Sequence, residues 1–348
     1  MVRNIFYFIQ SYVIILTSGG MEEEKSHIFI ISKVYKYQWE SKGVSFLEQV
    51  YPPSMDRVTR EIEKNVKKNK DLSKIYEVYK SVLAVQLQYM DRIEKTISIE
   101  ADPDKLKDLL RNGTFILSGY TLNMEGKLYK ELVQAICGAI KEASAEAPDN
   151  LLNLHTAEEF TEGANLQTFI KNIAKLNKQD LQDYLENTEM DKRTGLDSEV
   201  LSFVLVMALS TFYSLYMKKV REKTDFTLWR KGHCPVCGQV ASFARHRGED
   251  GARVLLCWLC HAEWVFPRIE CPYCGNKEQK KLRFFYLPGE KARQVHVCEV
   301  CNKYLKTVDG KALERDVLLD VEAIACGYLD DLAEKEGYKR PDDMTQMH

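Results

Sequence analysis

The chain lacks the sequence signatures that identify most enzyme classes. Its 348 residues contain no Gly-x-Ser-x-Gly elbow, His-Glu-x-x-His motif, phosphate-binding Walker loop or glycine-rich dinucleotide fingerprint. An excess of either charge is also absent, since 49 basic residues face 51 acidic ones. The composition therefore gives no whole-chain reason to expect binding to nucleic acid or to an anionic membrane, and either role would need a local basic patch.

Cysteine is scarce in most of the chain and concentrated in one short part of it. Gaps of 19, 10 and 23 residues separate four successive Cys-x-x-Cys pairs. Two such pairs can supply the four thiolates of a tetrahedral metal site. Because a short gap lies between two long ones, we expect the first pair to join the second and the third to join the fourth. The eight candidate ligands are Cys234, Cys237, Cys257, Cys260, Cys271, Cys274, Cys298 and Cys301.

This spacing is typical of metal sites rather than of a disulfide framework, and it favours a reducing compartment. Two pairs read Cys-Pro-x-Cys-Gly, in which proline presets the turn and glycine lets the chain leave it with positive φ. A four-sulfur site suits zinc and also a single rubredoxin-like iron. Zinc would be structural, because four cysteines leave no position for water, whereas iron could carry an electron. We interpret the neighbouring His233 and His261 as residues beside the sites.

The first 20 residues differ from the rest of the chain. Arg3 precedes a short apolar run, 5–16, which resembles a signal sequence or a membrane span of marginal length. The composition then changes abruptly at Met21, which begins a Met-Glu-Glu-Glu-Lys segment. We interpret residues 1–20 as a misassigned start or a leader. Translation from Met21 is the preferred hypothesis, because export would expose the cysteine pairs to oxidation.

Residues 21–230 are predicted to form a helical domain. Apolar residues recur every three or four positions over 72–97 and 127–145, and 165–185 has the pattern of one or two short amphipathic helices. The segment 200–217 is apolar on nearly all sides, but it contains four serine and threonine residues and is short for a membrane span. We interpret it as a buried central helix, and we expect no membrane span.

The composition changes again after residue 230, where glycine, proline and aromatic residues become frequent. We predict a first four-cysteine module at 231–267, a second at 268–310, and a helix and tail at 311–348, with Gly337 ending the helix. Each long gap between cysteine pairs is expected to hold a β-hairpin. The predicted fold class is α+β: an N-terminal all-helical domain, two consecutive rubredoxin-like or zinc-ribbon-like four-cysteine modules, and a C-terminal helix.

Particular residues accompany the cysteine pairs. Trp229-x-x-Gly precedes the first pair, a Cys-Trp-Leu-Cys-His-Ala-Glu-Trp run ends at Trp264, and a Cys-Glu-Val-Cys-Asn-Lys-Tyr-Leu-Lys run ends at Lys306. These segments resemble those of the FdhE-type formate dehydrogenase accessory proteins. The resemblance is close over 229–341. In the helical half it is looser and rests on architecture and on 114–122.

The resemblance implies a cytoplasmic, non-enzymatic protein that binds the catalytic subunit of a formate dehydrogenase and assists its maturation. It implies an N-terminal helical domain and two rubredoxin-like modules. All eight paired cysteines would bind metal, with iron associated with these pairs in the family and zinc as the alternative. No catalytic residue, other cofactor or nucleic-acid partner is expected.

Two other classes of function remain open at this stage. A zinc-ribbon protein that binds nucleic acid would need a basic stripe, and Arg245-His246-Arg247 offers one small basic hairpin. Acidic residues are interspersed in the same region, namely Glu249, Asp250, Glu263, Glu270, Glu278 and Glu290. A redox enzyme that uses one labile pair as a dithiol is the other possibility, and it would show one fast-reacting pair of thiols.

Overall fold

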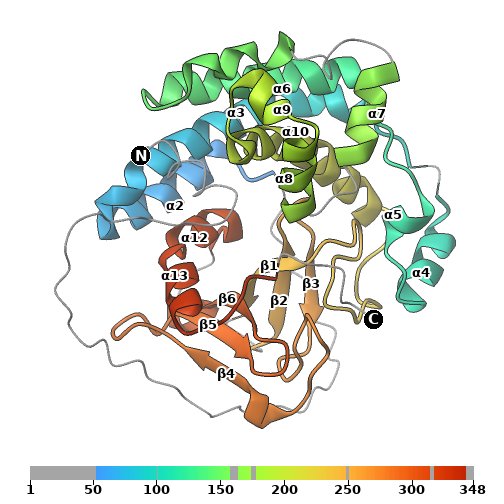
Figure 1. Cartoon of the computed structure of the whole chain (residues 1–348). Helices are drawn as coiled ribbons and strands as arrows, with labels where there is room; N and C mark the ends of the chain where they lie inside the picture. Colours follow the sequence, from blue (N-terminus) through green and yellow to red (C-terminus); the bar gives the residue numbers. More distant parts are fainter. Residues whose placement is uncertain are drawn as a thin grey trace.

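The structure is a computed structural model. It describes residues 52–99, 101–156, 164–173, 178–247, 251–313 and 317–341. Residues 1–20 and the proposed start at Met21 lie outside these ranges. Within the described residues, most of the helices gather at one end of the molecule and the strands at the other (Figure 1).

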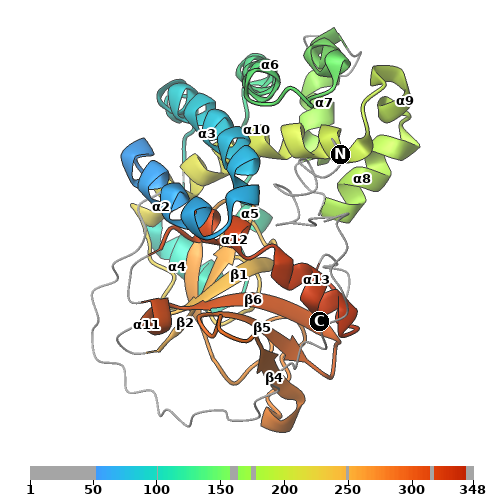
Figure 2. The ribbon, with the colours of Figure 1, turned by 90° about the vertical axis from the view of Figure 1, so that its left-hand side faces the viewer.

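The first part of the described chain is helical. We call α2, α3 and α6 to α10 the helical layer; α4 and α5 lie beside it, near the strands (Figures 1 and 2). The helices that the periodicity predicted are confirmed, and the segment 165–185 forms two of them. The helices are α2 (Met55–Lys68), α3 (Ser73–Glu94), α4 (Pro103–Arg111), α5 (Ile116–Gly119), α6 (Gly126–Ala143), α7 (Ala164–Ile173), α8 (Lys178–Asn187), α9 (Met190–Thr194) and α10 (Ser198–Arg221).

Helix α10 is the central element of the helical layer. It begins where the Asp197 carboxylate accepts the Glu199 N–H at 3.0 Å. It packs against α3, α6 and α8, and the Tyr129 hydroxyl donates to its Leu205 carbonyl at 3.2 Å. By length and composition α10 is apolar enough to cross a membrane, but 94% of its most apolar window is buried inside the protein. The prediction of a buried central helix is confirmed.

The strands form one six-stranded sheet with the order β3-β2-β1-β6-β5-β4. Strands β1 and β6 pair in parallel, and every other neighbouring pair is antiparallel. The two hairpins expected in the long gaps are β1–β2 and β4–β5. The predicted fold class is confirmed, with an addition: the β1–β6 pairing joins the two modules into a single sheet. The strands are β1 (Ala241–His246), β2 (Arg253–Cys257), β3 (Glu263–Phe266), β4 (Leu282–Phe285), β5 (Arg293–Cys298) and β6 (Lys303–Asp309).

C-terminal helices cover one face of this sheet. Leu329 and Ala333 pack into a core formed by apolar strand residues such as Phe243, Phe285 and Val295. Figure 2 shows α12 beside the helical layer and α13 over the strands, in agreement with the contacts of α12 with α2 and of α13 with β5 and β6. The helices are α11 (Gly310–Leu313), α12 (Leu319–Ala325) and α13 (Tyr328–Lys335).

The C-terminal helix differs in two respects from the prediction, which placed a single helix from residue 313 to Gly337. Residues 317 and 318 are not helical, and α12 begins only at Leu319. The helix is interrupted at Cys326 and Gly327, between α12 and α13. The interruption allows α12 to contact α2 while α13 lies on β5 and β6. Gly337 ends α13 as expected. Its φ is +85°, and the Gly337 and Tyr338 N–H groups donate to the carbonyls of Glu334 and Ala333.

Candidate metal centres

The paired cysteines form two separate groups in space. Cys234, Cys237, Cys257 and Cys260 form centre 1, and Cys271, Cys274, Cys298 and Cys301 form centre 2. Within each group the sulfur atoms lie within 4.8 Å of one another, and the nearest pairs are 3.4–3.7 Å apart. A tetrahedron with metal–sulfur bonds of about 2.3 Å has edges of about 3.8 Å. Each group can therefore hold a metal ion. The pairing expected from the gaps is confirmed, while metal ligation by these residues stays a prediction.

The electrostatics of the grouped thiols also fit a cation. In centre 1, burial raises the pKa of Cys237 and Cys260 well above the ordinary thiol value. Burial opposes ionisation of Cys234 too, but hydrogen bonds from the other three thiols lower its pKa well below that value. In centre 2, the hydrogen bond with Cys271 lowers the pKa of Cys301 to about 5. One thiolate is thus stabilised by neighbours that keep their protons. Four adjacent thiolates require a bound cation.

The backbone of each Cys-x-x-Cys loop is arranged around the sulfurs. The Val236 and Tyr273 N–H groups donate to the Sγ atoms of Cys234 and Cys271 at 3.4 Å in both cases. The residue that follows the second cysteine of every pair has a positive φ. Sequence analysis identified this feature only for the two glycines. The four residues are Gly238, His261, Gly275 and Asn302.

Centre 1 is enclosed by helices. Cys234, Cys257 and Cys260 have no exposed surface. The first loop is attached to α5 through its carbonyl oxygens, since Ile116 and Leu117 donate their N–H groups to residues 235 and 236, both at 2.9 Å. Gly238 faces the ring of Phe115, and a Cβ at position 238 would lie 2.9 Å from that ring. This glycine is therefore required by close approach as well as by its φ of +79°.

His261 joins centre 1 to two helices. Its Nε2 hydrogen-bonds to Ser210 Oγ of α10 at 2.9 Å, and its Nδ1 lies 3.2 Å from Asp320 Oδ1 of α12. Burial acts to lower the pKa of His261, but Asp320, with the charges of Cys257 and Glu263, more than offsets it, and the pKa is raised. The interpretation of His261 as a neighbour of the site agrees with this arrangement. His233 also lies beside centre 1, with its ring edge-on to Trp229 at 5.0 Å.

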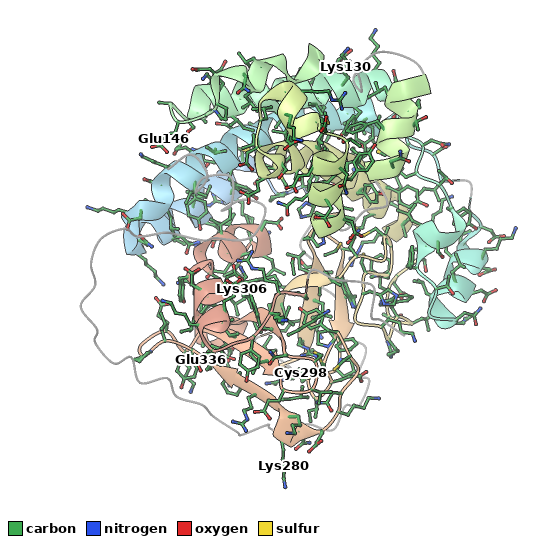
Figure 3. All side chains as sticks on the ribbon, viewed as in Figure 1. Lys130, Glu146, Lys280, Cys298, Lys306 and Glu336 are labelled. Atoms are coloured by element: carbon green, nitrogen blue, oxygen red, sulfur yellow. The ribbon has the colours of Figure 1, made fainter. Side chains whose placement is uncertain are left out.

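Centre 2 lies at the strand-rich end of the molecule. Cys271 and Cys298 are buried, whereas Cys274 is exposed. Val300, in the fourth loop, is 59% exposed. Figure 3 shows Cys298 within the strand-rich half and Lys280 projecting from the tip of that half, away from the helical layer. Centre 2 thus has one candidate ligand, Cys274, at the surface.

The two modules are in direct contact. A Cβ on Gly232 would lie 1.8 Å from the Pro272 carbonyl oxygen, so the chain before the first pair runs against the backbone of the third. The Tyr273 hydroxyl donates to the Ala241 carbonyl at 3.1 Å. Buried Arg253 on β2 donates to the carbonyls of Pro267 and of residue 270, in the link between the modules. The two modules therefore pack directly against each other.

The basic hairpin on which the nucleic-acid alternative depended is largely internal. Arg245 forms an ion pair with Glu263 at 3.0 Å, and the two side chains are only 11% and 7% exposed. His246 is also buried, edge-on to His296 with ring centroids 5.2 Å apart. Because strand residues alternate between the two faces, neighbours in the sequence do not form one surface patch. This segment does not supply the exposed basic patch that nucleic-acid binding requires.

Comparison with known proteins extends the likeness beyond the cysteine pairs. No protein-family model matches the chain. An FdhE homologue from Aquifex aeolicus (strain VF5) is 30% identical over 178 residues, which cover 49% of this chain and 59% of that protein. An FdhE homologue from Stutzerimonas stutzeri (strain A1501) is 35% identical over 136 residues, which cover 36% and 40%. The resemblance to the FdhE proteins is confirmed. The chain matches about half the length of these curated FdhE relatives.

The crystal structure of the FdhE protein from Pseudomonas aeruginosa has a similar fold. The two structures share a TM-score of 0.53 at 20% sequence identity, over 84% of this chain and 96% of that one. At this identity the match establishes the fold alone. Its extent shows that the FdhE fold includes the helical layer as well as the sheet.

Proposed function

We propose that the chain is a non-enzymatic, cytoplasmic accessory factor that binds the catalytic subunit of a formate dehydrogenase and assists its maturation. The observation that carries this proposal is the likeness to FdhE proteins in both sequence and fold. The two groups of four cysteines support it. Four sulfur ligands would fill a tetrahedral metal site and leave no position for the bound water that a hydrolytic metal enzyme needs.

Each centre is proposed to hold one iron or zinc ion through its four cysteine sulfurs. Iron in such a site would supply one-electron redox chemistry, and zinc would supply structural stabilisation only. In either case the four cysteines of each centre would bind its ion. The loops and their surrounding helices fix the positions of the sulfurs.

The helical layer is proposed as the docking surface for the partner subunit. Centre 1 contacts α10 of this layer and also α5 and α12, which lie beside the layer. An ion at centre 1 would therefore hold these helices in place, and its loss would alter the surface that the partner meets.

Deletion of the gene in its host tests the proposed role. We expect formate dehydrogenase activity to be lost while the catalytic subunit is still made, as measured by activity assay and immunoblot on the same extracts. Complementation with Cys257→Ser should fail. Complementation with Cys137→Ala, which removes a buried thiol of α6 outside both centres, should succeed. Normal activity in the deletion strain would refute the proposal.

The partner and the metal are tested separately. Affinity purification of the tagged chain should retain the catalytic subunit, and absence of that subunit from a stable, folded sample would count against direct binding. Metal analysis after anaerobic purification should give two ions per chain. An absorption spectrum then distinguishes the metals, because ferric four-sulfur sites are coloured and zinc sites are not.

A further inference from the structure

The second cysteine pair of each centre is followed by a residue that breaks the glycine pattern. Gly238 and Gly275 follow the first pair of each centre, whereas His261 and Asn302 occupy the equivalent positions with φ of +56° and +58°. Glycine adopts such backbone angles without steric penalty, and other residues do so rarely. In both cases the side chain bonds to a distant part of the chain.

His261 ties centre 1 to the start of α12. Its Nδ1 lies 3.2 Å from Asp320 Oδ1, and its Nε2 lies 2.9 Å from Ser210 Oγ. The preceding residue, Cys260, is a candidate ligand with no exposed surface. A shift of the second loop would therefore move or release the N-terminal turn of α12.

Asn302 ties centre 2 to the end of α13. Its Nδ2 donates to the Gly337 carbonyl at 2.8 Å, and its own carbonyl accepts the Lys339 N–H at 2.8 Å. The Tyr304 N–H donates to the Lys339 carbonyl at 3.1 Å, so the segment after α13 runs beside the first residues of β6. A shift of the fourth loop would be transmitted to the C-terminal end of α13.

The two attachment points are joined by a short and well-anchored connection. Arg293 of β5 and Glu322 of α12 form a buried ion pair at 2.6 Å. Lys306 of β6 and Asp330 of α13 form another at 2.7 Å. Removing one partner of such a pair leaves an uncompensated buried charge, so each pair holds its helix in one position on the sheet. The two anchored helices, joined at Cys326 and Gly327, form the path between Asp320 and Gly337.

We propose that α12 and α13 couple the two metal centres, so that an ion bound at one centre strengthens retention of the ion at the other. His261 and Asn302 are the positioning residues for this coupling. The proposal rests on metal binding at both centres, as put forward above. An ion fixes the loops that carry these two residues, because metal-binding energy is folding energy in such loops. By linkage the coupling is reciprocal, and each ion favours the other equally.

The test measures release of Co(II), used as an absorbing probe, from the loaded full-length protein into excess chelator. The Cys274→Ser variant removes an exposed candidate ligand of centre 2, so the release phase that changes most in it is assigned to that centre. Asn302→Gly should speed release from centre 1 by about fivefold or more, and His261→Gly should do the same at centre 2. Glycine tolerates the positive φ at both positions, so each variant removes only the side-chain attachments.

Glu189→Gly is the matched control, since Glu189 also has a positive φ (+54°) but lies at the start of α9. Release from both centres should be unchanged in it. If His261→Gly fails to fold, Asp320→Asn replaces it, because it weakens the same contact from the α12 side. Effects confined to the centre next to each substitution would overturn the coupling. Failure of the parent protein to bind Co(II) at either centre would instead refute the metal sites themselves.

Discussion

The two centres share one ligand set and differ in their surroundings. Centre 1 lies under the helical layer, with three of its four cysteines fully enclosed, whereas centre 2 lies at the far end of the sheet with Cys274 at the surface. The coordination chemistry is decided within a few residues of each pair. Burial is decided by the position of the module in the fold. The same motif can therefore join two structural layers at one site and face solvent at another.

The charged groups near the two centres also differ in burial. Arg245 and Glu263 pair in the interior near centre 1. Near centre 2, Lys277 lies 3.5 Å from Glu270, and its side chain is mostly exposed. Exposed ion pairs contribute little to the stability of the fold, because water and salt screen them. Breaking a buried pair costs more stability, since it leaves an unpaired charge out of water.

The largest expected difference follows from removing one ligand at each centre. Cys257→Ser should lower the free energy of unfolding by roughly 3 kcal/mol or more, because metal binding at centre 1 also holds the helical layer. Cys274→Ser should cause less than half of that loss, since its side chain is exposed. Denaturant unfolding followed by helical circular dichroism measures both. Equal losses would remove the distinction between the two centres.

Substitution of the paired cations gives the next largest difference. Arg245→Ala should cost about 3 kcal/mol because it leaves the buried Glu263 without its partner. Lys277→Ala, its surface counterpart near centre 2, should cost less than about 0.5 kcal/mol. Urea midpoints of the metal-loaded variants measure both changes. A similar cost for the two would show that the Arg245 pair is solvated in solution.

The rate of metal release compares the two centres directly. We expect centre 2 to lose its ion to a chelator about tenfold faster than centre 1, because Cys274 gives the chelator access to one ligand. Stopped-flow absorption of the Co(II)-loaded protein should show two phases, and the faster should be altered in Cys274→Ser. If the slower phase is the one altered, exposure of the Cys274 side chain does not control the rate of Co(II) release.

A smaller effect is expected at His246, on the β1 strand where the two modules meet. Burial, with the positive charges of His296, Arg268 and Arg253, lowers the pKa of His246 well below 6.5. The folded pKa is thus below the unfolded one, so this stability is present above pH 6.5 and is lost as the pH falls below it. The loss approaches about 1.4 kcal/mol per pH unit.

His246→Gln should therefore lose less stability than the parent protein between pH 6.5 and 5.5. Thermal unfolding of the two proteins across this range measures the difference. The metal ligands are common to both, so their own response to acid cancels in the comparison. Parallel pH profiles would contradict the assigned role of His246.

Local pattern was enough to predict several features of the fold and the site. Cysteine spacing indicated the two groups, and the apolar character of 200–217 on nearly all sides indicated the buried α10. The parallel pairing of β1 with β6 could not be predicted in the same way, because the strands are separated by 56 residues, 247–302, and no local signal selects the partner. The break at Cys326 escapes prediction for a similar reason, since it depends on what α12 and α13 each pack against.

Two kinds of residue show where local pattern succeeds and where it fails. Alignment of the four Cys-x-x-Cys pairs with one another places His261 and Asn302 where the other two pairs have glycine. This local signal was sufficient to predict a positive φ at both positions, but only the two glycines were identified from the sequence. Arg245 is the opposite case, because its place in a basic tripeptide suggests a surface patch. Its largely buried position depends on Glu263, which lies 18 residues away on β3 and which strand alternation alone does not pair with it.

The pairing of β1 with β6 has a consequence for how the protein is made. Translation proceeds from the N-terminus, so β1 leaves the ribosome well before its parallel neighbour. Until residue 303 has emerged, the first module has an open strand edge of the kind that recruits other chains. Early metal binding by the four cysteines of centre 1 would let this nascent segment fold before the rest of its sheet has been synthesised. Supply of the ion during synthesis, and not only afterwards, would then determine how much of the protein reaches its final fold.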